Sequence, residues 1–444
     1  MEKIIPQQLH ALAHACPTPL YLVGGCVRDY LSNLTPCGVR DFDICAPLSP
    51  DAFIPIALAS HFTVRSVYKA TGTIKLCDSE NNEYEYSTFR SDKYVRGVHT
   101  PVETVFTTDI TLDAKRRDFA ANAVYYDVKR GEFCDPLGGI PAIHEKRFTT
   151  VAPAEKVFGE DGLRLMRLAR QAGQLGFSPD EECIAGASQN ASLIRDITPE
   201  RVFAELCLLL HADQKYGVAY AQYAGIKLLD ATRVLDYILP ELTLGRGVTQ
   251  RADYHKYDIL EHSLRAVKYA DTSVRLASLL HDIGKPFCAF RDGNVYAHPE
   301  EGARIAETVL HRLKAPKKAT LRICELVKLH MYDFNCKTSE NKLRRFFVEH
   351  YPVLDDLLLV KQADFSACTD DTSIAPTVDR WQKLLAERAP VTLKTLAVTG
   401  LDLVPLVPTH KIAEALHMLL LHVAVNPQDN ERNRLCKIAH SLYG

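Results

Sequence analysis

The chain has 444 residues, of which 47% are apolar and 24% charged, and its net charge is −2. This composition is typical of a globular protein with two or three domains and excludes a fibrous or low-complexity chain. Because the charge is nearly balanced, any surface for nucleic acid has to be a local patch. The 13 scattered cysteines include no CxxC pair, which argues against a zinc ribbon and favours reduced thiols.

The sequence shows no sign of targeting or membrane insertion. Residues 1–19 lack the cationic start and apolar core of a signal peptide. No apolar run reaches the roughly 20 residues that a membrane-spanning helix needs. We therefore expect a cytoplasmic protein that does not associate with membranes.

The first 150 residues mix short apolar runs with Gly, Pro and Asp, a texture typical of a small α/β domain. Apolar runs and period-two alternation predict strands, and a stretch that follows a Gly-Gly pair predicts a helix. The expected strands are residues 19–23, 42–45, 83–89 and 122–128, and the expected helix is residues 27–34. This part of the chain should therefore contain a small mixed sheet.

After about residue 150, strand signals become few and helical patterns follow one another. One helix is expected at residues 159–175, where arginines three apart form a cationic stripe. Others are expected at residues 199–211 and 412–425, and residues 370–376 are the best candidate linker. The pattern predicts an α+β chain whose sheet-containing part precedes an all-helical remainder.

A first candidate site combines Gly24-Gly25 with the sequence Asp41-Phe42-Asp43. A Gly-Gly pair between a strand and a helix lets backbone N–H groups approach a phosphate. Alternation along a strand turns Asp41 and Asp43 to the same face, where they repel each other unless a cation such as Mg²⁺ lies between them. Glu85, on a later strand, is a further candidate ligand. The alternatives are a solvated acidic loop for the Asp pair and an exposed strand carboxylate for Glu85.

Arginine-rich segments follow this acidic pair. Arg117 is the second residue of an arginine pair, and guanidinium groups of this kind bind phosphate in a bidentate way. Asp161, Arg164 and Arg167 recur every third residue and are expected on one helical face, with Arg170 following. An Asp and an Arg together offer the acceptors and donors that match the edge of a base. The alternative is a salt-bridged stripe on a solvated helix.

The order of these segments resembles a known enzyme family. GGCVRD, DFD, YEYSTFR, RRDFAANA, DPLGG and EDGLRLMRLAR occur in this order over about residues 20–175. They resemble the motifs of the class II nucleotidyltransferases of the polymerase β superfamily. That family comprises CCA-adding enzymes, their CC-adding and A-adding relatives, and bacterial poly(A) polymerases. ERVFAEL, at residues 200–206, extends the similarity.

The resemblance implies roles for individual residues. Asp41 and Asp43 would hold the catalytic Mg²⁺ ions, while Asp161 and Arg164 would pair with the incoming base. Side chains and backbone that would bind the rest of the nucleotide are Gly24, Gly25, Arg28, Arg117, Arg167 and Arg170. The family usually has Thr where Ala120 stands, so one polar contact of the family is absent here.

A second candidate site consists of histidines and aspartates. His281-Asp282 ends an apolar run and precedes Gly284, which is expected to end the helix and to place the pair at its C-terminus. His262 precedes this pair, and three further candidate ligands follow it, namely His298, His330 and Asp364. Neutral imidazole together with carboxylate suits a borderline divalent ion.

This region, residues 250–370, resembles the HD phosphohydrolase superfamily. The resemblance implies a primary metal site of His262, His281, Asp282 and Asp364. His298 and His330 would bind a second ion, and the role of His255 stays open between orienting a neighbour and none. The identity of the metal and the question of turnover also stay open.

The resemblances together predict four parts: a nucleotidyltransferase head (1–150), a nucleotide-selecting neck (151–248), an HD domain (249–370) and a helical tail (371–444). The expected enzyme adds CCA to tRNA 3′ ends from CTP and ATP with Mg²⁺, and releases pyrophosphate. The alternatives are a poly(A) polymerase and a partial CC- or A-adding enzyme. Two other classes also stay open: an HD phosphohydrolase with an RNA-binding head, and a non-catalytic tRNA-binding protein.

Overall fold

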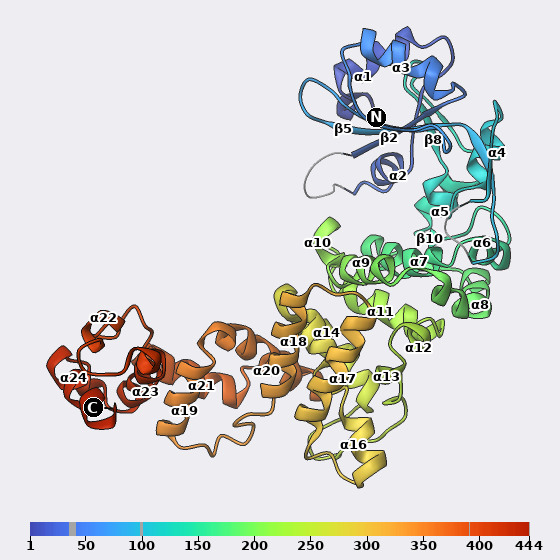
Figure 1. The fold of residues 1–444 in the computed structure, drawn as a ribbon. Coiled ribbons are helices and arrows are strands. Elements are labelled where there is room, and N and C mark those ends of the chain that lie inside the picture. The colour runs from blue at the N-terminus through green and yellow to red at the C-terminus, as the bar shows by residue number, and fades with distance from the viewer. Residues whose placement is uncertain (35–40, 98–100, 390, 444) are drawn as a thin grey trace. The chain divides into compact units, whose positions relative to one another are not determined.

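The fold of the protein, a computed structural model, is described for residues 1–34, 41–97, 101–389 and 391–443 (Figure 1). Contacts divide it into two compact units. The first unit comprises Met1–Thr243 and Arg312–Ala315, and the second comprises Leu244–His311 and Pro316–Gly444. The expected α+β fold is confirmed, because a mixed sheet lies in the first unit and helices make up nearly all of the remainder.

A seven-stranded mixed sheet forms the centre of the head, in the order β3-β4-β5-β2-β1-β8-β9. Its only parallel pair among the described strands is β2 with β5. The strands are β1 (Tyr21–Val23), β2 (Asp41–Ala46), β3 (Thr63–Tyr68), β4 (Thr73–Cys77), β5 (Glu83–Thr88), β8 (Tyr125–Asp127) and β9 (Glu132–Cys134). Two smaller pairs are β6 (Arg90–Lys93) with β7 (Glu103–Phe106), and β10 (Arg147–Phe148) with β11 (Ser178–Pro179).

Aromatic residues bury one face of this sheet. The helices α1 (Gln7–Ala15) and α3 (Pro50–Ala59) lie on that face, and α2 (Gly25–Leu31) lies on the other (Figure 1). Phe53 of α3 stacks on Tyr86 with ring centroids 3.7 Å apart, and Phe42 stacks on Tyr84. Because side chains alternate along a strand, burying Phe42 on this face turns its neighbours Asp41 and Asp43 to the opposite face.

Helices complete the first unit. Those nearest the sheet are α4 (Ile110–Lys115) and α5 (Gly139–His144), with the 3₁₀ turn η2 (Ala120–Asn122) between them. The rest are α6 (Ala154–Glu160), α7 (Leu163–Leu175), α8 (Glu181–Asn190), α9 (Pro199–Leu210), α10 (Ala212–Tyr216), α11 (Ala221–Ala231), α12 (Leu235–Ile238) and α13 (Pro240–Thr243). Helix α7 packs against α9, α10 and α11, so it is buried on most of its faces.

The prediction of one continuous helix at residues 159–175 is wrong. The chain forms two helices, and Asp161 lies between α6 and α7 in extended backbone, with φ −144° and ψ 107°. Its carboxylate accepts a hydrogen bond from the backbone N–H of Leu163, which satisfies one free donor at the start of α7. Asp161 therefore does not share a helical face with Arg164 and Arg167.

The second unit is helical. Its helices are α14 (Ile259–Tyr269), α15 (Arg275–Leu280), α16 (Lys285–Asp292), α17 (His298–Arg312), α18 (Lys317–Leu329), α19 (Glu340–Glu349), α20 (Leu354–Thr369), α21 (Pro376–Glu387), α22 (Gly400–Leu403), α23 (Ile412–Val425) and α24 (Arg432–Tyr443). Helices α14, α15, α18 and α20 pack against one another. The helices from α22 onward share an apolar core that includes Leu403, Leu419 and Leu435.

The expected role of Gly284 is also wrong. Helix α15 ends at Leu280, and Gly284 precedes Lys285 at the start of α16 instead of capping α15. A Cβ atom at Gly284 would lie 2.4 Å from the backbone oxygen of His298. Glycine is thus required because two segments approach closely here.

Among the described residues, no helix is both long and apolar enough to cross a bilayer.

Candidate functional site

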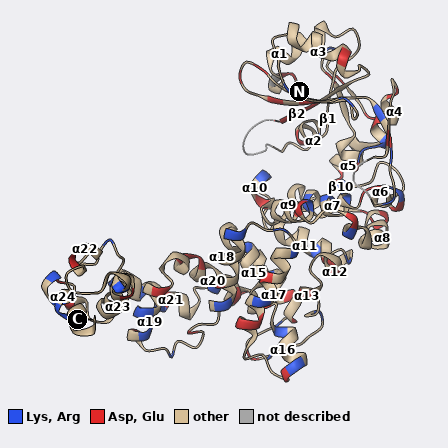
Figure 2. Cartoon of the chain, viewed as in Figure 1, with Lys and Arg blue, Asp and Glu red and all other residues tan. Residues whose placement is uncertain are grey.

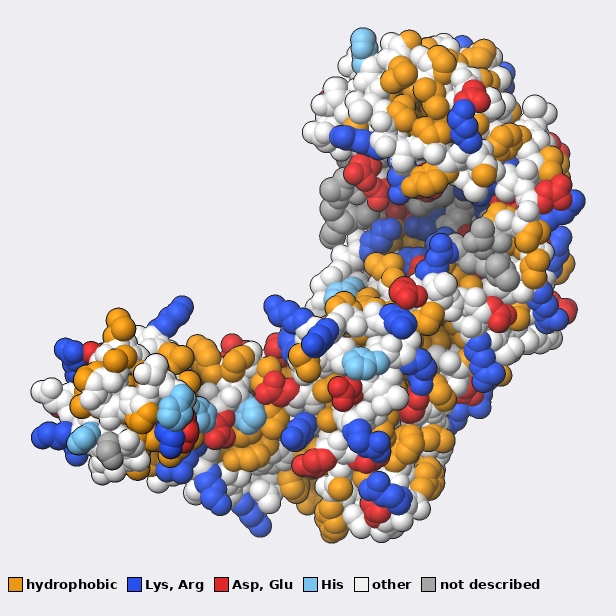
Figure 3. Space-filling model, in the orientation of Figure 1, with side chains coloured by type: hydrophobic (Ala, Val, Ile, Leu, Met, Phe, Trp, Pro, Cys, Tyr) orange, Lys and Arg blue, Asp and Glu red, His pale blue; other side chains and the backbone are white. Residues whose placement is uncertain are grey.

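A cavity of about 680 Å³ opens in the first unit between the sheet and the helices α7, α9 and α10. Figure 3 shows this hollow with blue Lys and Arg side chains gathered in it. Predicted residues that line the cavity are Gly24, Gly25, Arg28, Asp43, Glu85, Arg117, Asp161, Arg164, Arg167 and Arg170. Asp41 lies at the exposed start of β2 and does not line it. The structure thus brings ten of the eleven predicted nucleotide-site residues around one cavity.

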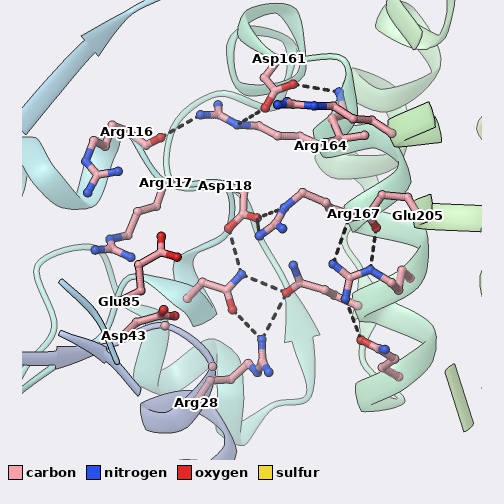
Figure 4. A pocket seen from close by; sticks show the side chains of 18 of the residues that line it. Arg28, Asp43, Glu85, Arg116, Arg117, Asp118, Asp161, Arg164, Arg167 and Glu205 are labelled. Carbon is pink, nitrogen blue, oxygen red and sulfur yellow. Dashed lines mark hydrogen bonds and ion pairs between the residues drawn. The ribbon is translucent and has the colours of Figure 1, made fainter. Parts of the chain in front are cut away.

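The acidic residues of this site are aligned by the pairing of β2 with β5. In that parallel register Asp43 lies opposite Glu85, and Asp41 lies opposite Glu83. Asp43 and Glu85 point into the cavity from the strands (Figure 4). Carboxylate oxygens are the hard ligands that Mg²⁺ prefers, and that ion usually takes only one or two carboxylates and completes its shell with water and phosphate.

The surroundings of Asp43 disfavour the ionised form of its carboxyl group relative to the neutral form. Although its side chain is exposed to the cavity, the surrounding walls remove enough water to raise the pKa of Asp43 to about 6. Arg117 opposes this rise, and Glu85 and Asp41 add to it. A carboxylate in such surroundings gains from a nearby cation. Gly24 has a φ of +77°, and a Cβ there would lie 2.7 Å from Oδ2 of Asp43, so the glycine leaves this oxygen accessible.

Most arginines of the cavity are held by a carboxylate. Arg167 contacts Asp118 with Nη2 2.7 Å from Oδ2, and Arg170 contacts Glu205 with Nε 2.6 Å from Oε2. Asp113 holds two more, with distances of 2.8 Å to Arg116 and 3.1 Å to Arg117. Such pairs fix the orientation of the guanidinium groups before any ligand binds.

Arg28 is more enclosed than the sequence indicated. Its guanidinium donates hydrogen bonds to the side-chain oxygens of Asp29 (2.6 Å), Asn122 (2.7 Å), Gln171 (3.2 Å) and Tyr216 (3.0 Å). These residues belong to α2, η2, α7 and α10. Arg28 lines the cavity but also joins the sheet-bearing part of the head to the helices that face it.

Arg164 and Asp161 lie at the cavity wall formed by the junction of α6 and α7 (Figure 4). Nη1 of Arg164 donates to the backbone oxygen of Val157 at 3.0 Å, and Nη2 donates to that of Arg116 at 2.8 Å. Nε of Arg164 lies 4.0 Å from Oδ2 of Asp161. Burial raises the pKa of Asp161, which the Leu163 N–H and Arg164 partly oppose. The pair therefore presents a fixed donor beside an acceptor.

Some lining residues were not predicted. Asp118 accepts from Arg167 and from Asn122, and burial, which raises its pKa, is outweighed by Arg167 and these hydrogen bonds, so the pKa is lowered. Asp118 and Asn122 lie in the RRDFAANA motif, and this motif is the sequence signal that could have identified them. Lys215, on α10 (which carries a blue segment in Figure 2), and Arg201 also line the cavity. Arg201 lies in the ERVFAEL segment, which was the signal for it, whereas no local pattern indicated Lys215.

The predicted metal ligands of the second unit lie together. Nε2 of His262 lies 3.1 Å from Nε2 of His281, 3.3 Å from Oδ2 of Asp282 and 3.1 Å from Oδ1 of Asp364. These four ligand atoms lie within 4.8 Å of one another. They come from α14, from the turn after α15 and from α20, so helix packing assembles the set.

Asp282 also belongs to a second set. Its Oδ1 lies 3.3 Å from Nε2 of His298 and 3.5 Å from Nε2 of His330. Neither oxygen of Asp282 accepts a well-aligned hydrogen bond from any described residue, although Nζ of Lys285 lies 2.6 Å from Oδ2. One buried carboxylate thus turns one oxygen to each set of histidines.

The tautomers of three histidines fit metal binding. The Nδ1 atoms of His281, His298 and His330 lie 2.6–2.7 Å from backbone carbonyl oxygens, which accept only if Nδ1 carries the proton. Each Nε2 then has a free lone pair, and the Nε2 atoms of His298 and His330, 3.2 Å apart, cannot form a hydrogen bond with each other. A cation between the two lone pairs would remove this repulsion. The Nδ1–H bonds to backbone carbonyls are the second-shell hydrogen bonds that metal-binding histidines usually make.

The electrostatics of the cluster also attract a cation. Burial alone would lower the pKa of His281, but Asp282 and Asp364 raise it to about 10, so the carboxylates favour a positive charge there. Burial lowers the pKa of His330 to about 4, which keeps that ring neutral at pH 7. Among the described residues, the sets of at least three ligand atoms within 4.8 Å all lie in this second unit.

Three family models match the chain. The "Poly A polymerase head domain" matches residues 20–149, the "Probable RNA and SrmB- binding site of polymerase A" matches residues 176–244, and the "HD domain" matches residues 259–364. The polymerase β-like head and the His/Asp cluster of the HD domain both imply divalent metals.

Curated proteins are similar over part of their length. The A-adding tRNA nucleotidyltransferase of Deinococcus radiodurans is 32% identical over 278 residues, which cover 59% of this chain and 61% of that protein. The CCA-adding enzyme of Geobacillus kaustophilus is 35% identical over 196 residues, covering 43% of this chain and 45% of that protein. The chain thus matches less than two thirds of the length of either relative.

A solved structure shares the whole fold. The CCA-adding enzyme of Bacillus stearothermophilus in complex with CTP superposes with a TM-score of 0.67 at 23% identity, and the match covers 98% of this chain and 97% of that one. At this identity the likeness shows the fold alone, and the family models and relatives supply the rest. The chain carries a poly(A) polymerase head domain and an HD domain, and it is similar to A-adding and CCA-adding tRNA nucleotidyltransferases.

Proposed function

We propose that this enzyme adds CCA to the 3′ ends of tRNA, using CTP and ATP without a nucleic-acid template. The supporting observation is a single cavity with acidic residues on one wall, Asp43 and Glu85, and with Asp161 and Arg164 on another. The RNA 3′-hydroxyl attacks the α-phosphate of the nucleotide, and pyrophosphate leaves. We assign this reaction to the cytoplasm.

In this proposal Asp41, Asp43 and Glu85 hold Mg²⁺ on the exposed face of β2 and β5. Bound Mg²⁺ supplies Lewis acidity for the 3′-hydroxyl and charge compensation for the leaving pyrophosphate. Gly24 and Gly25 bring the N-terminus of α2 close to the triphosphate, and neither carries a side chain that would block Asp43.

The arginines of the cavity bind the triphosphate. Arg117, Arg167 and Arg170 are already oriented by carboxylates, so little side-chain entropy is lost when phosphate binds. Arg28 contributes charge from within its hydrogen-bond network. Eight cationic side chains line the cavity against five carboxylates, which favours a polyanion there.

Asp161 and Arg164 select the base. Arg164 offers N–H donors and Asp161 offers an acceptor, and both are held by hydrogen bonds to the backbone of α6 and α7. A rigid pair of this kind discriminates bases by hydrogen-bond pattern, because a mismatched base leaves a buried polar group unpaired.

An A-adding enzyme is the first alternative, because one relative that matches over 278 residues at 32% identity carries that name. A poly(A) polymerase and a CC-adding enzyme are further alternatives, since all share the catalytic motifs. The buried His/Asp cluster supports a second activity, metal-dependent hydrolysis of a phosphoester by the HD domain. We further propose that the chain comprises four parts, divided near residues 150, 248 and 370.

One experiment tests these assignments. The full chain is incubated with Mg²⁺, each labelled nucleotide, and tRNA ending at the discriminator base, at C or at CC. Addition of CTP and then ATP that stops after CCA supports the proposal, whereas ATP addition only to the CC end supports the A-adding alternative. Long adenylate tails indicate a poly(A) polymerase. Absence of incorporation together with metal-dependent phosphoester cleavage supports the alternative of an HD phosphohydrolase with an RNA-binding head.

A further inference from the structure

His262 is an exception among the buried histidines of the HD cluster. The other three rings donate Nδ1–H to a backbone carbonyl, whereas Nδ1 of His262 is buried and has no hydrogen-bond partner among the described residues. The ring has no exposed surface, and its Nε2 faces His281 and Asp364. Leaving a polar atom unpaired at this depth is unfavourable, so a missing partner is expected at Nδ1.

Two potential ligands lie beside His262. His255 packs edge-on against it, with ring centroids 4.9 Å apart, and Nδ1 of His255 is also buried without a partner among the described atoms. Cys368 is the third member, and one ligand atom from each residue lies within 4.8 Å of the others. This is the one set of potential ligands among the described residues that contains a cysteine.

The backbone holds this group in place. His255 lies in the segment before α14, and Cys368 lies in the last turn of α20. The N–H of Lys256 donates to the backbone oxygen of Cys368 at 3.0 Å, and Nζ of Lys256 donates to the backbone oxygen of Thr369 at 3.2 Å. The two segments are therefore joined directly beside the candidate ligands.

We propose that His255, His262 and Cys368 form a third metal position, which shares His262 with the primary set and takes a thiophilic divalent cation of the Zn²⁺ class. Two imidazole nitrogens and a thiolate are soft or borderline ligands, and three protein ligands leave a fourth tetrahedral position for water. The bound cation replaces one proton, that of the Cys368 thiol, because a neutral imidazole binds through its unprotonated nitrogen and keeps its N–H on the other. The thiol now donates only a weak 3.4 Å hydrogen bond to the backbone oxygen of Asp364.

The proposed position is coupled to the primary HD site through His262. Its Nε2 faces the first set of ligands, so the atom left for the third position is Nδ1. A neutral imidazole shared by two cations has to lose its one N–H proton and become an imidazolate, which disfavours full occupancy of both positions. A thiophilic cation at Cys368 should therefore weaken binding of a harder metal by the primary set.

Cadmium provides a direct probe, because a cysteine thiolate bound to Cd²⁺ gives an ultraviolet charge-transfer band. The full-length protein is titrated with Cd²⁺, and the band and the bound metal are measured together. We expect about one thiolate-bound Cd²⁺ per chain, loss of the band in Cys368→Ser and Cys368→Ala, and at least tenfold weaker binding in His255→Ala. Cys324→Ser is the matched control, because Cys324 belongs to none of the ligand sets.

Thermal unfolding of each variant separates loss of the site from loss of the fold. The proposal is overturned if folded Cys368→Ser or Cys368→Ala keeps the band, or if the wild-type protein shows none. It is also overturned if His255→Ala binds Cd²⁺ as tightly as the wild type. None of these readouts depends on nucleotidyl transfer, so failure of the proposed enzymatic function leaves this test intact.

Discussion

The hydroxyl of Tyr216 donates a 2.7 Å hydrogen bond to Oδ2 of Asp29, a residue 187 positions earlier in the chain. The same hydroxyl accepts a 3.0 Å hydrogen bond from Arg28. Helix α10 is thereby fixed to α2, and the guanidinium of Arg28 is fixed at the edge of the cavity. Tyr216 is a positioning residue, since it acts on Arg28 and does not itself line the cavity.

Tyr216→Phe should therefore raise KM for CTP and ATP about three- to tenfold, with a smaller effect on kcat. The hydroxyl is lost, and a buried donor and acceptor each lose a partner, so the free energy of unfolding should also fall by about 1–3 kcal/mol. Tyr30→Phe on α2 is the control, because Tyr30 stacks on Phe133 through its ring. Equal KM values in the two variants would contradict a positioning role for Tyr216.

Two glutamates on the same face of β5 allow a test of metal binding by Glu85, with Glu83 as the matched control. Glu85→Gln should reduce nucleotide incorporation about 10³-fold, because a metal ligand contributes several kcal/mol to transition-state stabilisation. Glu83→Gln should change it little, since Glu83 lies on the same face of β5 but does not line the cavity. Incorporation assays at saturating Mg²⁺ measure both variants. If the two behave alike, Glu85 is an ordinary exposed carboxylate of the strand.

Asp161→Asn tests base selection while preserving the local fold. An Asn oxygen can still accept the hydrogen bond from the Leu163 N–H, so the start of α7 should remain intact. The change replaces one acceptor by a donor, and we expect the ratio of kcat/KM for CTP and ATP to shift at least tenfold. Competition between the two nucleotides measures the ratio. An unchanged ratio with normal RNA binding would assign Asp161 a purely structural role.

Asp282 should control metal binding by the HD domain. Asp282→Asn removes the charge shared by both histidine sets, and bound metal per chain should fall in both. In the wild type, EDTA should lower thermal stability, since a ligand at 100 times its Kd contributes about 2.7 kcal/mol. The variant should respond less to EDTA than the wild type, because only the His255, His262 and Cys368 position keeps all its ligands. Asp379→Asn, which alters an exposed pair with Lys383, should behave as the wild type does in metal analysis and unfolding.

Asp370 should make the stability of the second unit depend on pH. Partial burial would raise its pKa, but hydrogen bonds from Tyr257, Tyr269 and Arg265 lower the pKa to about 2. Because the folded pKa lies below the unfolded value of about 3.9, this stabilisation is present above pH 4 and is lost as the pH falls toward 2.

Asp370→Asn should therefore destabilise the protein by about 1 kcal/mol at pH 7, a value reduced by solvent screening because the side chain is 32% exposed. Asn tolerates the positive φ of 63° at this position, so backbone strain does not confuse the result. Denaturant unfolding at several pH values should show the difference from the wild type shrinking between pH 4 and pH 2. A difference that is constant with pH would contradict the assignment.

The sequence alone determined the fold class and the face to which the first acidic candidates turn. Period-two alternation in β2 turned Asp41 and Asp43 to one face, and the sheet-then-helix order fixed the α+β class. These features are local, because neighbouring side chains and backbone preferences produce them without reference to the rest of the chain. The same local signal failed at Asp161, where a break in the backbone interrupts a pattern that looks continuously helical.

The tertiary structure alone decided how those residues face one another. The pairing of β2 with β5 placed Glu85 opposite Asp43, and helix packing gave one oxygen of Asp282 to each histidine set. The carboxylates that hold Arg167 and Arg170 are 49 and 35 residues away from them in the chain. Such partners are chosen by the burial of apolar faces between distant segments, and no short-range pattern encodes that choice.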